Sequence, residues 1–172
     1  MNVILIGMPG SGKSSVGVVL AKRLGMDFLD TDIVIQKKTQ KRLSEIISEE
    51  GVEEFLKLEE EVNASLQVED TIIAPGGSVV YGEKAMHHFR EIGVVIYLKI
   101  GYKEMISRIG DIHTRGVALP NGMKLSEMYE ERDKLYEQYA HYVVDELHKT
   151  KGKVISEIVS LVDELLLGFT KK

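Results

Sequence analysis

The sequence has no cysteine among its 172 residues. This absence excludes disulfide bonds, thiolate metal sites and cysteine nucleophiles, and it is compatible with the reducing cytoplasm, where we expect the protein to work. Long apolar runs are also lacking, since no window approaches the roughly 18 consecutive apolar residues of a membrane span. The opening run MNVILIG has no basic flank and leads directly into a glycine-rich turn, which favours a buried strand over a signal segment. We therefore expect no membrane partner.

An excess of basic residues is missing as well. Lysine and arginine number 22 against 27 aspartates and glutamates, which gives a net charge of -5. This balance argues against nonspecific binding to nucleic acid or to an anionic membrane. No Pro/Gly/Ser-rich linker, internal repeat or low-complexity tract divides the chain, and nothing indicates an obligate protein partner. We predict a single domain over residues 1–172, a length that can enclose a substantial core.

Short β-rich runs alternate with helical patterns along the chain. This rhythm is typical of βαβ units, so it predicts an α/β fold with a parallel sheet and helices on both faces. The predicted strands are 2–6, 27–30, 71–74, 94–100 and 142–145, and the clearest helices are 14–24, 42–51, 52–67, 83–92, 102–110, 126–140 and 153–167. The segment 110–123 follows neither periodicity. A loop of this length in a compact domain is usually functional, which favours a lid over a plain connection.

The first strand leads into GMPGSGKS, Gly7 to Ser14, which fits G-x-x-x-x-G-K-[ST] at every required position and precedes a helix. In such a loop, backbone N–H groups surround the β-phosphate, the lysine reaches the β- and γ-phosphates, and the hydroxyl binds Mg²⁺. A glycine turn without this function is the alternative, but the flanking strand and helix oppose it. We expect ATP and Mg²⁺ as ligands. The expected nucleotide-binding residues of the loop are Gly10, Ser11, Gly12, Lys13, Ser14 and Ser15.

The acceptor of the γ-phosphoryl group is the next question. The guanine-reading N-K-x-D motif is absent, and the strand TIIAPGG ends without the acidic residue of a Walker-B strand. Asp30 and Asp32 stand at the end of the second strand, so they are expected beside the P-loop at the carboxyl edge of the sheet. Asp30 and Ser14 are then the expected magnesium-linked pair, and Asp32 is expected to face an acceptor hydroxyl as base or orienter. The alternative for Asp32 is an N-cap of the helix that follows.

At this point the residues resemble the shikimate kinase family. The resemblance runs through GMPGSGKSSVG, FLDTD, GVEEFLKLEEEV, APGGSVV, HTRG and EERDKLYEQYA. It implies a P-loop kinase of three α/β/α layers, with a five-stranded parallel sheet in the order 2-3-1-4-5. It also implies acceptor-binding helices at about 31–66 and a closing lid at about 110–123. The implied reaction moves the γ-phosphoryl group of ATP to the 3-hydroxyl of shikimate.

The resemblance also assigns three arginines. Arg108 matches the arginine that stacks on adenine, Arg115 the lid arginine that closes over the phosphates, and Arg132 one that holds the carboxylate of the acceptor. Without the resemblance, a solvated surface charge would be the better interpretation of each. The expected catalytic residues are then Lys13, Asp32 and Arg115.

Two positions depart from the family pattern in the acceptor site. The glycine triplet that cradles shikimate is Gly76, Gly77 and Ser78 here, and the arginine that grips the shikimate carboxylate is replaced by Leu56. Losing one partner of such a charge pair costs on the order of 2–5 kcal/mol. Leu56, which lies off the apolar stripe of its helix, is expected to form a wall of the acceptor pocket.

Several functions therefore stay open. Shikimate is the first expected acceptor, and a hydroxy-amino acid or a less charged polyol is the alternative, with Arg132 as the main anion contact. A non-catalytic nucleotide-binding module is a third hypothesis, although the P-loop and both aspartates are retained. The glutamates of LEEE are interpreted as a solvated helix face, with a role for Glu59 in orienting a neighbouring base as the alternative.

Overall fold

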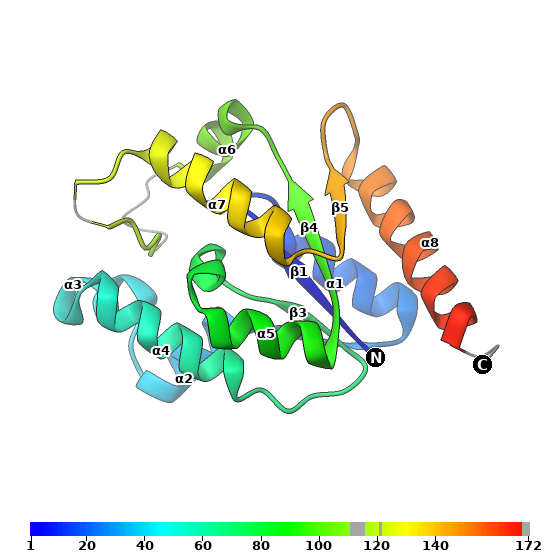
Figure 1. Cartoon of the computed structure of the whole chain (residues 1–172), viewed down its shortest axis with the longest axis horizontal. Coiled ribbons are helices and arrows are strands. Elements are labelled where there is room, and N and C mark those ends of the chain that lie inside the picture. The colour runs from blue at the N-terminus through cyan, green and yellow to red at the C-terminus, as the bar shows by residue number, and fades with distance from the viewer. Residues whose placement is uncertain (111–115, 121, 170–172) are drawn as a thin grey trace.

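The computed structural model describes residues 1–110, 116–120 and 122–169. Its centre is a five-stranded sheet in the order β2-β3-β1-β4-β5, in which every neighbouring pair is parallel (Figure 1). The strands are β1 (Asn2–Ile6), β2 (Asp27–Asp30), β3 (Thr71–Ala74), β4 (Gly93–Lys99) and β5 (Tyr142–Asp145). The predicted fold class and strand order are confirmed.

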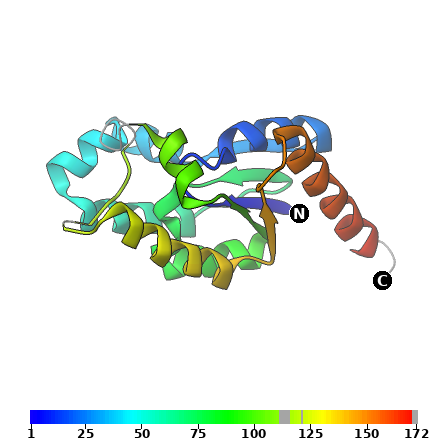
Figure 2. The ribbon, with the colours of Figure 1, turned by 90° about the horizontal axis from the view of Figure 1, so that it is seen from above.

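Helices cover both faces of the sheet. Figure 2 shows α1 and α8 on one side and α5 and α7 on the other. The helices are α1 (Lys13–Leu24), α2 (Thr31–Thr39), α3 (Leu43–Glu50), α4 (Val52–Ala64), α5 (Glu83–Ile92), α6 (Tyr102–Ile109), α7 (Leu125–Tyr139) and α8 (Lys151–Phe169), with a 3-10 helix η1 at Gly77–Tyr81. None of the helices within the described ranges is both long and apolar enough to cross a membrane.

The central strand β1 explains why the sheet is covered twice. Its side chains alternate between faces, so Val3 and Leu5 join the cluster under α1 and α8 while Ile4 and Ile6 join the cluster under α5 and α7. All four side chains are fully buried. A strand buried on both faces needs an unbroken apolar run, and NVILI supplies it.

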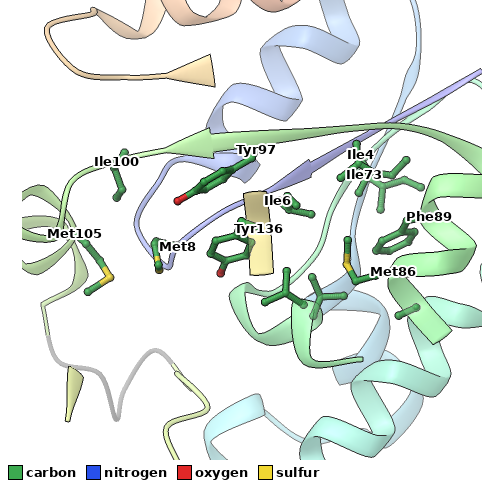
Figure 3. Packing of buried hydrophobic residues seen from close by; sticks show 14 of the residues in the cluster. Ile4, Ile6, Met8, Ile73, Met86, Phe89, Tyr97, Ile100, Met105 and Tyr136 are labelled. Carbon is green, nitrogen blue, oxygen red and sulfur yellow. The ribbon is translucent and has the colours of Figure 1, made fainter. Parts of the chain in front are cut away.

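Two tyrosines connect the sheet to α7 and η1, which border the site. Tyr97 of β4 and Tyr136 of α7 lie ring to ring, with centroids 4.9 Å apart (Figure 3). The Tyr97 hydroxyl donates a 2.6 Å hydrogen bond to Asp133, and the Tyr136 hydroxyl donates to the backbone carbonyl of Gly77. This packing fixes α7 and the start of η1, and with them Arg132 one helical turn before Tyr136.

Helices α2, α3 and α4 form a small subdomain at one end of the sheet (Figure 1). Its own apolar cluster contains Phe55 and Val62 of α4, and Leu56 is partly buried against the same cluster. Leu56 therefore meets the same cluster as Phe55 and Val62, on a helix that both α2 and α3 contact. Its expected place in the wall of the acceptor pocket stays a prediction. Helix α4 also ends at residue 64 rather than 67, where the Ser65 hydroxyl donates to the carbonyl of Val62.

Candidate active site

The P-loop lies between β1 and α1 and leaves the start of α1 open. Gly12, the N-cap residue, has φ 90°, a left-handed conformation that favours glycine, and no side chain caps the helix. A Cβ at Gly7 would lie 2.6 Å from the carbonyl oxygen of Leu98, so the loop can pass this close to β4 only with glycine there. Uncapped N–H groups at a helix N-terminus are suited to a phosphate.

Lys13 is folded back over this loop. Its Nζ donates to the carbonyls of Gly7 at 2.8 Å and Met8 at 3.0 Å, and burial lowers the pKa of the ammonium to about 8. The nearby Asp32 carboxylate opposes that lowering. The hydroxyl oxygen of Ser11 is buried and has no hydrogen-bond partner in the part of the chain that the structure describes. A phosphate group would fit this chemistry, because it offers oxygens to both residues.

Ser14 and Asp30 are in contact. The Ser14 hydroxyl donates a 2.8 Å hydrogen bond to Asp30 Oδ2, while Asp30 Oδ1 accepts from the backbone N–H of Asp32. Asp30, and not Asp32, is thus the N-cap of α2. Among the described residues no group of three or more acidic or histidine side chains could hold a metal alone. Two oxygen ligands beside a phosphate loop fit Mg²⁺, which typically keeps its waters and takes further ligands from phosphates.

Asp32 and Glu59 meet above the backbone of Gly76. A Cβ on Gly76 would lie 2.5 Å from Glu59 Oε1 and 2.8 Å from Asp32 Oδ1, and both of these buried oxygens lack a hydrogen-bond partner among the described residues. Burial raises the pKa of Asp32 to about 6, with the charge of Asp30 adding to it. Burial also raises the pKa of Glu59 to about 7, against the hydrogen bond from Ser78. Of the two residues, Asp32 is the one that is only partly buried and can accept a hydrogen bond from a ligand.

Arg132 supplies the positive charge at the same end. Its side chain is only 1% exposed, it donates from Nη2 to the carbonyl of Ala118, and its guanidinium lies 5.1 Å from the centroid of the Tyr81 ring. Its Nη1 would lie 3.3 Å from a Cβ on Gly77, so bare backbone there leaves the guanidinium room. Arg132 can therefore bind an anion beside two carboxylates.

One cavity of about 540 Å³ connects these groups. The predicted site residues that line it are Gly10, Gly12, Lys13, Ser14, Ser15, Asp30, Asp32, Gly76, Gly77, Ser78, Arg108 and Arg132. Ser11 is buried within the loop, and Leu56, which packs against the apolar cluster of α2–α4, is not among the described residues that line the cavity. The predicted lid arginine, Arg115, lies outside the described residues.

Arg108 reaches the P-loop from α6. Its Nη1 donates to the carbonyl of Gly10 at 3.3 Å and pairs with Glu146 at 3.1 Å, while its Nε pairs with Glu104 at 2.8 Å. Arg108 is therefore fixed beside the P-loop and is not a free surface charge. Stacking on a nucleotide base stays a prediction.

The sequence analysis interpreted Glu59 as part of a solvated helix face, and the structure differs. It is 1% exposed, so the interpretation of LEEE as a solvated face is wrong at this position. A usable signal was its spacing of four from Phe55 and three from Val62, both buried, which places it on the inward face of α4. Other lining residues that were missed include Pro9, Leu43, Phe55, Gly116, Val117, Ala118 and Lys151.

The comparisons with known proteins agree on one family. The family model for shikimate kinase matches residues 9–163. Shikimate kinase 2 of Enterobacter sp. is 35% identical over 92% of this chain and 93% of its own length, and the shikimate kinase of Paracidovorax citrulli is 36% identical over 92% and 88%. The chain belongs to the shikimate kinase family.

Solved structures of this family share the fold. Shikimate kinase from Acinetobacter baumannii, in complex with shikimate, matches with a TM-score of 0.84 at 27% identity, covering 95% of this chain and 93% of that one. Shikimate kinase from Aquifex aeolicus matches with a TM-score of 0.80 at 28% identity, covering 98% and 99%. Membership of the shikimate kinase family makes this protein an ATP-dependent small-molecule kinase, which disfavours the non-catalytic module.

Proposed function

We propose that this protein transfers the γ-phosphoryl group of ATP to the 3-hydroxyl of shikimate. The observation that carries the proposal is the single cavity that joins the P-loop to the carboxylates at Gly76 and to Arg132. Its relatives named as shikimate kinases, one of them with shikimate bound, support the choice of acceptor. A cytoplasmic location fits the absence of cysteine and the use of ATP.

At the donor end, the chain contributes electrostatics and position. The uncapped start of α1 and Lys13 would hold the phosphates, and Ser14 and Asp30 would hold Mg²⁺, which shields the phosphate charge when bound. Arg108 anchors Gly10 and borders the nucleotide end. In such a transfer the protein forms no covalent bond with the phosphoryl group. Positioning and electrostatic stabilisation therefore account for most of the rate of phosphoryl transfer.

At the acceptor end, Asp32 would align the reacting hydroxyl and accept its proton. A carboxyl group with a pKa of about 6 can do so near neutral pH. Arg132 would bind the carboxylate of shikimate, and the backbone of Gly76 and Gly77 borders the cavity that would hold its ring. Closure of 110–123 with Arg115 over the phosphates stays a prediction, since it rests on residues outside the described part of the chain.

A second acceptor class is favoured by one observation. The position where the family has its second carboxylate-binding arginine holds Leu56, which is uncharged. Its side chain packs against the apolar cluster of α2–α4. Arg132 is the cation that the described structure places beside Gly77. A hydroxy-amino acid or a less charged polyol would place a smaller demand on this one cation.

ATP consumption against a panel of acceptors tests the proposal. The panel contains shikimate, quinate, homoserine, serine and an uncharged polyol, each over a range of concentrations. We expect shikimate to have the highest kcat/KM. The proposal is wrong if another acceptor exceeds shikimate by about tenfold or more in kcat/KM.

A companion variant tests the missing anchor. Leu56→Arg should lower the KM for shikimate by about tenfold or more if a second cation is what the site lacks. Lys57→Arg, which changes an exposed cation on the same helix, is the matched control and should leave the KM unchanged. An unchanged KM in Leu56→Arg would show that the acceptor is already fully anchored.

A further inference from the structure

Arg132 is a buried cation that is held by uncharged groups. Among the described residues no carboxylate forms an ion pair with its guanidinium. Its Nη2 donates to the carbonyl of Ala118, its Nε donates a long 3.4 Å hydrogen bond to the Tyr81 hydroxyl, and a hydrogen bond also joins it to the Tyr136 hydroxyl. A buried charge without an ionic partner is costly, so this arrangement keeps the positive charge for an anion that enters the cavity.

Tyr81 makes two different contacts with this guanidinium. Besides the hydrogen bond to its hydroxyl, its ring lies against the group, with Arg132 Cζ 5.1 Å from the ring centroid. A cation at this distance from an aromatic face is attracted by the ring, and more strongly where water is excluded. Burial raises the pKa of the Tyr81 phenol, against the charge of Arg132, so the phenol is neutral at neutral pH and does not cancel that charge.

The 3-10 helix η1 brings both of its ends to the same arginine. Gly77, its first residue, lies beside Nη1, and Tyr81, its last residue, contacts Nε and the guanidinium plane. Nε and Nη2 are therefore engaged by the protein, while Nη1 lies next to a residue that lines the cavity. The orientation of a planar guanidinium decides whether it can bind a carboxylate well, so the groups that fix its plane matter for binding.

The other charged groups that act on Arg132 leave most of its charge uncompensated. Lys13 and Glu59 interact with it through space. Lys13 is a like charge, which favours an anion at this end of the cavity. Burial raises the pKa of Glu59 to about 7, so its carboxyl group is only partly ionised at neutral pH.

We propose that Tyr81 is a positioning residue that fixes the guanidinium of Arg132 for the carboxylate of the phosphoryl acceptor, and so sets the preference for an anionic acceptor. Tyr81 is not among the described residues that line the cavity, so it acts through Arg132 and does not touch the acceptor. The acceptor class that this arrangement favours is a hydroxylated carboxylic acid. The inference rests on the proposed function, because it assumes that the anion of the acceptor meets Arg132.

Two substitutions separate the ring of Tyr81 from its hydroxyl. Tyr81→Leu removes both contacts with the guanidinium, and Tyr81→Phe removes only the hydrogen bond. We expect the KM for shikimate to rise by about tenfold or more in Tyr81→Leu and by about threefold in Tyr81→Phe, with the KM for ATP within about twofold of the parent. Tyr142→Leu, at an exposed position of β5, is the matched control and should change neither KM.

The carboxylate of the acceptor gives a readout that a merely structural role of Tyr81 would not change. Shikimate methyl ester has the same ring and hydroxyls without the charge, so the preference is the ratio of kcat/KM for shikimate to kcat/KM for the ester. We expect this ratio to fall by about tenfold in Tyr81→Leu, because a guanidinium without a fixed plane loses its advantage for the charged acceptor. Equal losses with the acid and the ester, or no loss with either, would overturn the positioning role.

The Arg132→Lys background tests whether Tyr81 acts through Arg132. Adding Tyr81→Leu to that background should change the ratio by less than about twofold. A further tenfold fall would mean that Tyr81 acts independently of Arg132, which contradicts the inference. Thermal unfolding shows whether each variant folds, and if Tyr81→Leu does not, the threefold rise expected for Tyr81→Phe is the deciding measurement.

The acceptor panel distinguishes failure of this inference from failure of the proposed function. If shikimate is turned over well and the ratio is unchanged in both variants, the inference fails while the proposed function stands. If homoserine and not shikimate is the acceptor, the proposed function fails, and the ratio of homoserine to homoserine amide tests Tyr81 in the same variants. A preference for an uncharged polyol would overturn both, because no carboxylate would then meet Arg132.

Discussion

The guanidinium of Arg132 donates from Nη2 to the backbone carbonyl of Ala118, which joins α7 to the segment 116–120. The methyl group of Ala118 is buried in the cluster formed by α2, α3 and α4. One short contact thus holds Arg132, the connecting segment and helices α2, α3 and α4 in one arrangement.

Replacing Arg132 should affect the acceptor far more than ATP. Arg132→Lys keeps the charge but loses the planar fork that can hold a carboxylate and Ala118 together. We expect the KM for shikimate to rise by about 30-fold or more, which corresponds to roughly 2 kcal/mol, with the KM for ATP nearly unchanged. Lys134→Ala, on an exposed position of α7, is the control. Equal losses for both substrates would contradict the assignment of Arg132 to the acceptor.

Removing the hydroxyl of Ser14 should weaken the response to magnesium. Ser14→Ala deletes one of the two proposed oxygen ligands and the hydrogen bond to Asp30. We expect the Mg²⁺ concentration for half-maximal activity to rise by about tenfold at saturating ATP. Ser48→Ala, an exposed serine of α3, should not change it. A Mg²⁺ requirement equal to that of the parent would exclude Ser14 as a ligand.

Glu59 should make folding stability depend on pH. Burial raises its pKa from 4.5 to about 7, so between these values the folded protein holds a proton that the unfolded chain has released. This group therefore contributes a loss of stability as pH rises from about 4.5 to about 7. Glu59→Gln should be more stable than the parent at pH 8, by on the order of 2–3 kcal/mol, and nearly equal to it below pH 4.5.

Urea unfolding of the parent and of Glu59→Gln at pH 4.5, 6 and 8 measures this difference. Comparing the two proteins at each pH removes the contribution of the shared titrating groups that do not interact with Glu59, whereas Asp32, which acts on Glu59, contributes to the difference. A difference in stability that stays constant from pH 4.5 to 8 would show that the carboxyl of Glu59 does not titrate as the burial predicts.

The same substitution at two glycines should have opposite effects on stability. A Cβ on Gly17 of α1 would lie 2.6 Å from Phe28 Cε2, so Gly17→Ala forces the stiff ring of Phe28 to move and should destabilise by about 1–3 kcal/mol. Gly152, in the first turn of α8, has nothing closer than 3.9 Å, and Gly152→Ala should stabilise by up to about 1 kcal/mol. Thermal unfolding of both variants checks the pair, and a stabilising Gly17→Ala would refute the packing argument.

Strands, helices and the P-loop could be predicted because each is specified by local patterns. The apolar run of β1 requires burial on both faces, and the glycines of the P-loop require a backbone that other residues rarely adopt. The convergence of Ser14 and Asp30 was also predictable, because the carboxyl ends of parallel strands share one edge. The start of η1 at Gly77 left no comparable signal.

Leu56 and Glu59 show where sequence reasoning failed. The apolar stripe was correct for Phe55 and Val62, but the width of the covered arc depends on how α2 and α3 pack around α4, and this is tertiary information. Glu59 was assigned to the solvent because glutamates are mostly exposed. Its hydrogen bond to Ser78, 19 residues away in the sequence, is what the local pattern could not contain.

Arg132 and Glu59 also differ in how easily a substitution elsewhere can remove the contact that holds each of them. The anchor of Arg132 is a main-chain carbonyl, which every amino acid at position 118 would retain, whereas Glu59 is held by a side chain that a single substitution can remove. We therefore expect evolutionary drift in acceptor preference to proceed through positions 56, 59 and 78. The anion contact should persist through such changes, so new acceptors recruited by this scaffold would still carry a carboxylate or a similar negative group.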